Sequence, residues 1–289
     1  MPPKKTSAST KAGTSASTKP AGVKRGPPAA IRYYLVAFNF VSFFGWVLVL
    51  STLLKHLALG PQPFSLPVKY AAEFLEPLRR VKIGIVKSYS HLVPEPFASL
   101  LERASNSHTF VGSLVAAVQS LAILEVVHAA IGWVRSPVPT TAVQVASRLF
   151  MVWAVSERYS QAWTSPFYAS MVLAWAITEC IRYPFYANQL LGSEGTGLLW
   201  ARYTTFYLLY PIGAGSEAMC ILATLPKSLP WNNAGAWDLR AYVFGFLFVI
   251  WWPGLYVMYT HMMRQRKKAI GKGLWGDKLV QEIAAKKRQ

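Results

Sequence analysis

Two residues that can exchange protons, Tyr210 and Glu217, lie inside an apolar stretch of this 289-residue chain. Because they are seven residues apart, a helix would point both to the same face, about 10 Å apart along its axis. A charged residue at membrane depth costs about 2.5–3.5 kcal/mol on insertion scales, and such residues usually have a function. The pair suits a reaction in which one group removes a proton and the other protonates a leaving group.

The residues between and beside the pair favour a functional interpretation over simple packing. A proline, Pro211, removes one helical hydrogen bond, and Gly213 and Gly215 allow another helix or a ligand to come close. We therefore expect a kinked helix that opens a slot beside Glu217. The alternative for Tyr210 is a packed ring whose hydroxyl is hydrogen-bonded.

The composition indicates a membrane protein rather than a soluble domain. Hydrophobic residues make up 53% of the chain and charged residues only 15%, and several apolar runs are long enough to cross a bilayer. The expected fold class is an all-α, polytopic bundle of six transmembrane helices. The predicted spans cover residues 33–54, 110–134, 140–156, 166–181, 198–225 and 241–263.

Three parts are expected along the chain: a disordered basic tail (1–32), a transmembrane domain (33–263) and a basic C-terminal tail (264–289). Within the domain, residues 55–108 are predicted to form a long loop that carries an amphipathic helix near 75–87 on the bilayer surface. Most of the net charge of +18 lies in the two tails. This pattern favours cytoplasmic termini that lie against anionic membrane lipid, and it argues against nucleic acid as a partner.

The sequence gives no sign of a metal site or a bound cofactor. Its two cysteines, Cys180 and Cys220, lie in apolar runs without paired spacing, so neither a disulfide framework nor a zinc site is predicted. A glycine-rich dinucleotide fingerprint and a cluster of metal ligands are both lacking. We therefore expect no cofactor and no metal.

Other ionisable residues lie three apart in the predicted spans, which places them on shared helix faces. Glu125 and His128 are either a hydrogen-bonded pair that locks two helices together or a catalytic or proton-relay pair. Glu179 and Arg182 are either a structural ion pair, or Arg182 joins Arg202 in binding a phosphate or acyl headgroup through forked hydrogen bonds.

Three charges belong to the third predicted span. Arg148 lies within it, and Glu157 and Arg158 follow its end. We interpret the three as one interhelical and interfacial charge network.

Four blocks of the chain resemble the very-long-chain 3-hydroxyacyl-CoA dehydratases of fatty-acid elongation, also known as protein tyrosine phosphatase-like proteins. They are LEVVH (124–128), QVASR (144–148), AWAITE (174–179) and the segment 202–217, in order on four successive predicted spans. In the family's pattern the catalytic Tyr and Glu match Tyr210 and Glu217, and the arginine that opens the motif matches Arg202. We expect substrate-binding or supporting roles for Arg182, Arg202, Gly213, Ser216, Glu125, His128, Arg148 and Glu179.

The resemblance implies a lyase that removes water from 3-hydroxyacyl-CoA to give trans-2-enoyl-CoA, without a cofactor. Glu217 would remove the C2 proton and Tyr210 would donate to the departing hydroxyl, with the reverse assignment left open. Arg202 would stabilise the thioester oxygen, orient Tyr210 or contact CoA. The family's six-span enzymes reside in the endoplasmic reticulum membrane, where the elongase, ketoacyl reductase and enoyl reductase are expected partners. Residues 286–289 resemble the family's dilysine retrieval signal.

The phosphatase-like name of the family implies tyrosine phosphatase chemistry, which this sequence argues against. That chemistry needs a Cys thiolate between a His and an Arg. His128 and Arg135 are present, but Ala129 stands at the nucleophile position. Two other classes remain: a non-enzymatic membrane adaptor whose basic tails recruit partners, and, less favoured because internal symmetry is not evident, a transporter.

Overall fold

The computed structural model describes residues 28–61, 69–70, 73–74, 93–193 and 195–286. Over these ranges every regular element is a helix, so the all-α fold class is confirmed. The elements are α1 (Ala29–Leu59), α3 (Phe97–Leu121), α4 (Ile123–Ala130), α5 (Val138–Leu149), the π-helix η2 (Phe150–Ser156), α6 (Ser160–Trp163), α7 (Pro166–Leu190), α8 (Thr196–Thr204), α9 (Phe206–Ala223), the 3-10 helix η3 (Ala234–Ala236), α10 (Leu239–Ala269) and α11 (Asp277–Lys286).

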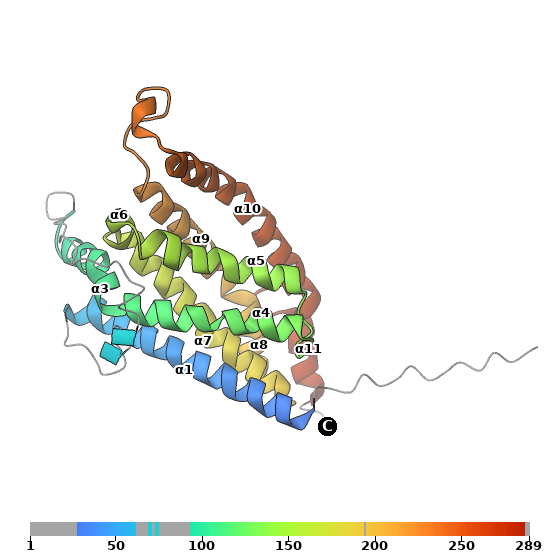
Figure 1. Ribbon diagram of the computed structural model, residues 1–289. Coiled ribbons are helices and arrows are strands. Elements are labelled where there is room, and N and C mark those ends of the chain that lie inside the picture. The colour runs from blue at the N-terminus through green and yellow to red at the C-terminus, as the bar shows by residue number, and fades with distance from the viewer. Residues whose placement is uncertain (1–27, 62–68, 71–72, 75–92, 194, 287–289) are drawn as a thin grey trace, which may run out of the picture.

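The central helix of the bundle is α7, which packs against α1, α3 and α9. The long helices lie alongside one another, and α8, α11, the start of α1 and the end of α10 gather at one end (Figure 1). The buried residues of α7 include Trp175, Glu179 and Tyr183. Because neighbouring helices cover this face, its polar groups contact protein rather than lipid.

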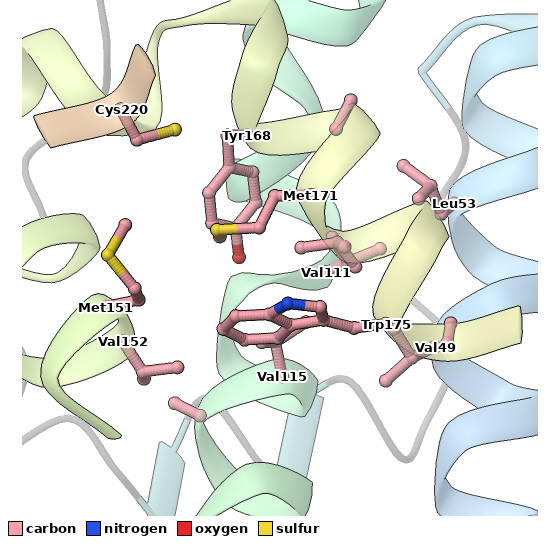
Figure 2. Packing of buried hydrophobic residues seen from close by; sticks show 14 of the residues in the cluster. Val49, Leu53, Val111, Val115, Met151, Val152, Tyr168, Met171, Trp175 and Cys220 are labelled. Carbon is pink, nitrogen blue, oxygen red and sulfur yellow. The ribbon is translucent and has the colours of Figure 1, made fainter. Parts of the chain in front are cut away.

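The hydrophobic core joins α7 to α1, α3, η2, α6, α9 and α10. Figure 2 labels some of its members: Val49 and Leu53 of α1, Val111 and Val115 of α3, Met151 and Val152 of η2, Tyr168, Met171 and Trp175 of α7, and Cys220 of α9. Fully burying an aliphatic side chain of this size contributes about 1.5–3 kcal/mol. The core therefore holds α7 and α9 in a fixed relation, which matters for the site between them.

Among the described residues, five helices are long and apolar enough to cross a bilayer: Ala29–Leu59, Phe97–Ala130, Val138–Ser156, Phe206–Ala223 and Leu239–Ala269. They correspond to five of the six predicted spans. The fourth predicted span corresponds to α7, which is 25 residues long but carries Glu179 and Arg182, and these charges lower its mean hydropathy.

The long loop predicted over 55–108 is shorter than expected. The first helix continues to Leu59 and α3 already begins at Phe97. Within α3, Arg103 Nη1 donates to the carbonyls of Leu57 and Ala58 at 3.0 and 2.7 Å, and so satisfies the C-terminal carbonyls of α1. By hydropathy the polar residues near Arg103 resemble a loop, yet they form a helix because contacts within the protein satisfy them. The predicted surface helix near 75–87 and most of the tail 1–32 lie outside the described residues.

The predicted fifth span, 198–225, is two helices rather than one. The break lies at Thr205, whose hydroxyl donates to the carbonyl of Ala201 at 2.9 Å. A bond from a threonine to the carbonyl four residues before it tends to bend a helix. Helix α9, with Pro211 inside it, runs on after this break without interruption.

The C-terminal boundary also differs from the prediction. Helix α10 continues to Ala269 and a further helix, α11, occupies part of the predicted tail. Arg266, in the last turn of α10, is 5% exposed and donates to the carbonyls of Gly273 and Leu274, each at 2.8 Å. These bonds hold the segment after α10 against the bundle. Of the expected retrieval signal, only Lys286 lies within the described residues.

Candidate active site

Glu217 lies on α9 and is partly buried against the central helix. Its Oε1 accepts a hydrogen bond of 2.7 Å from the indole Nε1 of Trp175 on α7. Trp175 is only 3% exposed, so this bond is shielded from solvent and correspondingly strong. On the other side, Trp251 of α10 lies near the carboxylate. Glu217 is therefore held inside the bundle, between two helices.

Tyr210 lies two turns before Glu217 on the same face of α9 and is half-buried. Its ring stacks on that of Tyr259 of α10, with the ring centroids 6.5 Å apart. The Tyr259 hydroxyl donates to the carbonyl of Tyr207 at 3.4 Å, a carbonyl that has lost its helical partner because a proline stands four residues later. Tyr210 is within electrostatic range of both Glu217 and Arg148. The two predicted catalytic residues thus share one region of the bundle.

A chain of ion pairs, with the buried Glu179 in its middle, joins α5, α7 and α4 beside this region. Arg148 of α5 donates to Glu179 Oε1, and Arg182 Nε donates to Glu179 Oε2 at 2.6 Å. The fork of Arg182 then makes two bonds to the carboxylate of Glu125, of 2.9 and 2.7 Å. Glu179 is 1% exposed. The two carboxylates and two guanidiniums neutralise one another, which is the condition under which charges are tolerated in a protein interior.

This geometry decides between the two interpretations of Glu179 and Arg182. They form a structural ion pair, and the forked N–H groups of Arg182 are already bonded to Glu125. Arg202 is placed differently: its Nη2 donates to the Tyr186 hydroxyl at 2.8 Å, and its guanidinium lies 4.9 Å from the ring centroid of Phe185. Both guanidiniums lie near the ring of Tyr186, with Arg182 at 5.8 Å and Arg202 at 4.6 Å from its centroid.

Glu125 and His128 both hold helices together, as one of the two alternatives has it, but each does so through its own partner and not through a bond to the other. Besides Arg182, Glu125 accepts a 2.6 Å hydrogen bond from the Tyr183 hydroxyl. His128 Nε2 lies 3.1 Å from the hydroxyl of Tyr34 on α1. The two residues share a face of α4, but one connects it to α7 and the other to α1.

In the predicted network of Arg148, Glu157 and Arg158, the part that concerns Arg148 is wrong. Glu157 Oε1 lies 3.1 Å from Nε2 of His108 on α3, and both side chains are almost fully buried. Arg148 turns instead toward α7, because the Glu179 carboxylate lies there. Arg158 is exposed.

A cavity of about 300 Å³ lies near Arg158, between the η2–α6 region and the start of α10. Its lining residues are Trp153, Ala154, Arg158, Tyr159, Arg240 and Phe244. Neither Tyr210 nor Glu217 lines this cavity, so it is separate from the candidate active site.

Two small residues hold α9 close to α7 next to Glu217. At Gly213, an added Cβ would lie 3.5 Å from the Cβ of Ala174, so the two helices are already in contact. One turn later, the hydroxyls of Ser216 and Ser170 are 2.7 Å apart. The motif residues Gly213 and Ser216 therefore position the helix that carries the candidate pair.

Trp175, Tyr183 and Tyr259 contact the predicted site residues, but sequence reasoning did not single them out. A signal for one of them was present: Trp175, Glu179 and Arg182 are spaced by four and three residues, which places them on one helix face. Tyr259 lies on another helix, and its place beside Tyr210 follows only from the packing of α10 against α9.

The site thus offers a carboxylate and a phenol on one helix face, with a guanidinium close to both. A carboxylate can act as a general base, a neutral phenol as a proton donor, and a fixed cation can stabilise negative charge that develops on a substrate. In the part of the chain that the structure describes, no group of three or more His, Cys, Asp or Glu residues is placed to hold a metal ion.

Comparison with known proteins gives concordant results. Residues 119–272 match the family described as "Protein tyrosine phosphatase-like protein, PTPLA". Over 157 residues the chain is 48% identical to a "Probable very-long-chain (3R)-3-hydroxyacyl-CoA dehydratase" of Schizosaccharomyces pombe, covering 54% of this chain and 73% of the relative.

Two further relatives match over more of the chain. The "Very-long-chain (3R)-3-hydroxyacyl-CoA dehydratase 2" of Mus musculus is 30% identical over 256 residues, which cover 86% of this chain and 84% of the relative. The Arabidopsis thaliana dehydratase PASTICCINO 2 is 32% identical over 219 residues, or 70% of this chain and 98% of the relative. No solved structure matches the chain.

Proposed function

This chain belongs to the protein tyrosine phosphatase-like protein family, PTPLA, and we propose that it removes water from very-long-chain 3-hydroxyacyl-CoA to give trans-2-enoyl-CoA. Its relatives are named as dehydratases of this substrate class. The observation that carries the proposal is local: Glu217 is held inside the bundle by Trp175, and Tyr210 on the same face lies within electrostatic range of it.

In the proposed reaction the C2–H and C3–O bonds break and a double bond forms between C2 and C3. Glu217 takes the C2 proton, and Tyr210 protonates the departing 3-hydroxyl group, which leaves as water. A proton then passes from Glu217 to the Tyr210 phenolate, which restores both groups. No electrons leave or enter the substrate, so the step needs no redox cofactor.

The reaction also balances with Tyr210 as the base and Glu217 as the acid. Exchange of the C2 proton with heavy water distinguishes the two assignments. With Glu217 as the base, Tyr210→Phe keeps some exchange of the C2 proton with heavy water although elimination fails. Loss of that exchange in Tyr210→Phe, with its retention in Glu217→Gln, reverses the roles.

Arg148 is the cation that fits the thioester oxygen. Removal of the C2 proton places negative charge on that oxygen, and a fixed cation in a water-poor site stabilises such charge. Arg148 lies within electrostatic range of both Tyr210 and Glu217 and is fixed by Glu179. Arg202, for which we expected this role, the orientation of Tyr210 or a contact with CoA, bonds to Tyr186, and of the three roles we assign it the contact with CoA phosphates.

We further propose that α7 is a sixth membrane span. At about 1.5 Å per residue its 25 residues are long enough to cross a 30 Å hydrocarbon layer. Its charges are paired inside the protein, which removes most of the cost of placing them there. Six spans put both termini on one side, and the basic tails make that side the cytoplasm. The endoplasmic reticulum membrane, with the other elongation-cycle enzymes as partners, is the corresponding location.

The test uses membranes that contain wild-type protein, Tyr210→Phe or Glu217→Gln, each supplied with a 3-hydroxyacyl-CoA. Both substitutions are nearly isosteric, so each variant should accumulate normally while enoyl-CoA formation is lost. Tyr256→Phe is the matched control, because Tyr256 is exposed on α10 and should keep wild-type turnover.

The outcomes also separate an enzyme from the non-enzymatic adaptor. An adaptor yields no enoyl product from the wild-type protein, whatever the variants do. If wild type is active but both site variants turn over at a near-normal rate, the reaction stands and the assignment of Tyr210 and Glu217 is wrong.

A further inference from the structure

Trp175 occupies an unusual position, because it belongs at once to the hydrophobic core and to the candidate site. Figure 2 shows its indole in the middle of the packed side chains, near Met171 and Val115. It is 3% exposed, yet its one polar atom, Nε1, donates the 2.7 Å hydrogen bond to Glu217. A buried indole N–H needs an acceptor, and a Phe would fill the core here without that requirement.

The position of the indole ring is determined by three helices. It extends from α7, and the guanidinium of Arg148 on α5 lies 5.2 Å from its ring centroid. Arg148 is itself fixed by its ion pair with Glu179, one turn after Trp175 on α7. On the α9 side, an added Cβ at Gly213 would lie 3.9 Å from Trp175 Cδ1. The indole therefore has little freedom to turn away from Glu217.

We propose that Trp175 is a positioning residue for the dehydration, acting through Glu217. An indole N–H only donates and points in one direction, so it fixes the position of Oε1 and leaves Oε2 outside this bond. Oε2 is then presented to the C2 proton of the substrate. The inference rests on the proposed function, and it adds that Trp175 orients the catalytic base Glu217.

The direct test is Trp175→Phe in the full-length protein, assayed in membranes or detergent with a 3-hydroxyacyl-CoA. Loss of one hydrogen bond to a charged group should lower kcat by about 10- to 100-fold. KM should change little, because Trp175 is enclosed by core side chains and acts on the base rather than on the bound thioester.

Trp153→Phe is the matched control. The Trp153 indole also donates between helices, to the hydroxyl of Ser120 at 3.1 Å, but that bond is not part of the candidate site. Its loss should leave kcat within about twofold, an effect below about 0.5 kcal/mol. Equal losses of kcat in the Trp153→Phe and Trp175→Phe proteins would show that any missing indole bond loosens the bundle, and would overturn the proposal.

If Trp175→Phe does not accumulate, replacement of Trp175 by benzothienylalanine keeps the bicyclic shape and removes only the N–H group. The same loss of kcat is expected with normal accumulation. Wild-type kcat in this protein contradicts the proposal.

A double-mutant cycle with Glu217→Asp separates positioning from packing. The shorter carboxylate of Glu217→Asp is out of reach of Trp175, so adding Trp175→Phe should cause little further loss of residual turnover. If the fold-loss of turnover in the double variant equals the product of the fold-losses in the two single variants, Trp175 does not act through Glu217.

The inference and the proposed function can fail separately. If Glu217→Gln keeps wild-type turnover, the assignment of the base fails and the inference falls with it. If Glu217→Gln is inactive while Trp175→Phe has wild-type kcat and KM, only the role of Trp175 is wrong.

Discussion

The chain of ion pairs beside the site gives a sharp prediction for Glu179→Gln. Glu179 is 1% exposed and accepts from Arg148 through one oxygen and from Arg182 through the other. Glutamine has nearly the same shape but no charge, and its amide nitrogen cannot accept. The substitution therefore leaves two guanidiniums facing a neutral group, and the one that meets the amide nitrogen loses its bond at this position, although Arg182 keeps its bonds to Glu125.

The size of the effect follows from these contacts. Removing one partner of a buried ion pair costs about 3–5 kcal/mol. The side chains of Arg148 and Arg182 are 26% and 23% exposed, so solvent partly compensates them and the lower limit of about 3 kcal/mol applies. In a chain of this size about 1 kcal/mol corresponds to roughly 2–4 °C. Glu179→Gln should therefore lower Tm by about 6–12 °C.

The assay is thermal unfolding of the purified protein in detergent, together with dehydratase turnover below Tm. Turnover should fall as well, because Arg148 loses the carboxylate that fixes it beside Trp175. Glu73→Gln is the matched control: Glu73 pairs with Lys69 at 4.0 Å on an exposed surface, where such a pair contributes less than about 1 kcal/mol.

An unchanged Tm in Glu179→Gln refutes the reasoning, since it would mean that the buried ion pairs add nothing to the folded state. A drop in Tm with wild-type turnover contradicts only the second part, the link from Glu179 through Arg148 to the reaction.

Two further predictions concern stability and helix spacing. Tyr183→Phe removes the 2.6 Å hydrogen bond to the charged Glu125 and should destabilise the protein by about 1.5–3 kcal/mol, measurable as a lower Tm without a change in KM. Gly213→Leu should push α9 away from Ala174 at a cost of about 1–3 kcal/mol and lower turnover at least tenfold. In contrast, Gly215→Leu should be tolerated, because an added Cβ at Gly215 meets nothing within 4 Å; equal losses in the two glycine variants would contradict this account of the spacing.

Hydropathy and helical periodicity predicted a large part of this fold. Long apolar runs indicate helices whether or not their partners are known, and five of the six predicted spans correspond to helices that can cross a bilayer. Periodicity also placed Tyr210 and Glu217 on one face of a helix. Both features depend on local sequence, which is why they could be derived without a structure.

The errors have a common physical cause, which is that hydropathy and spacing describe polar residues without their partners. Hydropathy predicts a loop around Arg103. In the structure Arg103 lies in a helix and donates hydrogen bonds to the last carbonyls of α1. The ion pair of Arg148 with Glu179 joins residues 31 apart in the chain. Such partners depend on which helices meet, and a single sequence does not contain that information in its local spacing.

The central claim is that Glu217 and Tyr210 exchange protons with the C2 and C3 positions of an acyl-CoA. The most direct measurement runs the reaction in reverse. It adds trans-2-enoyl-CoA to the purified protein in heavy water and determines the deuterium content of the product by mass spectrometry. Wild-type protein should form 3-hydroxyacyl-CoA with deuterium at C2, and Glu217→Gln should form none. Deuterated product from Glu217→Gln at the wild-type rate would contradict the claim.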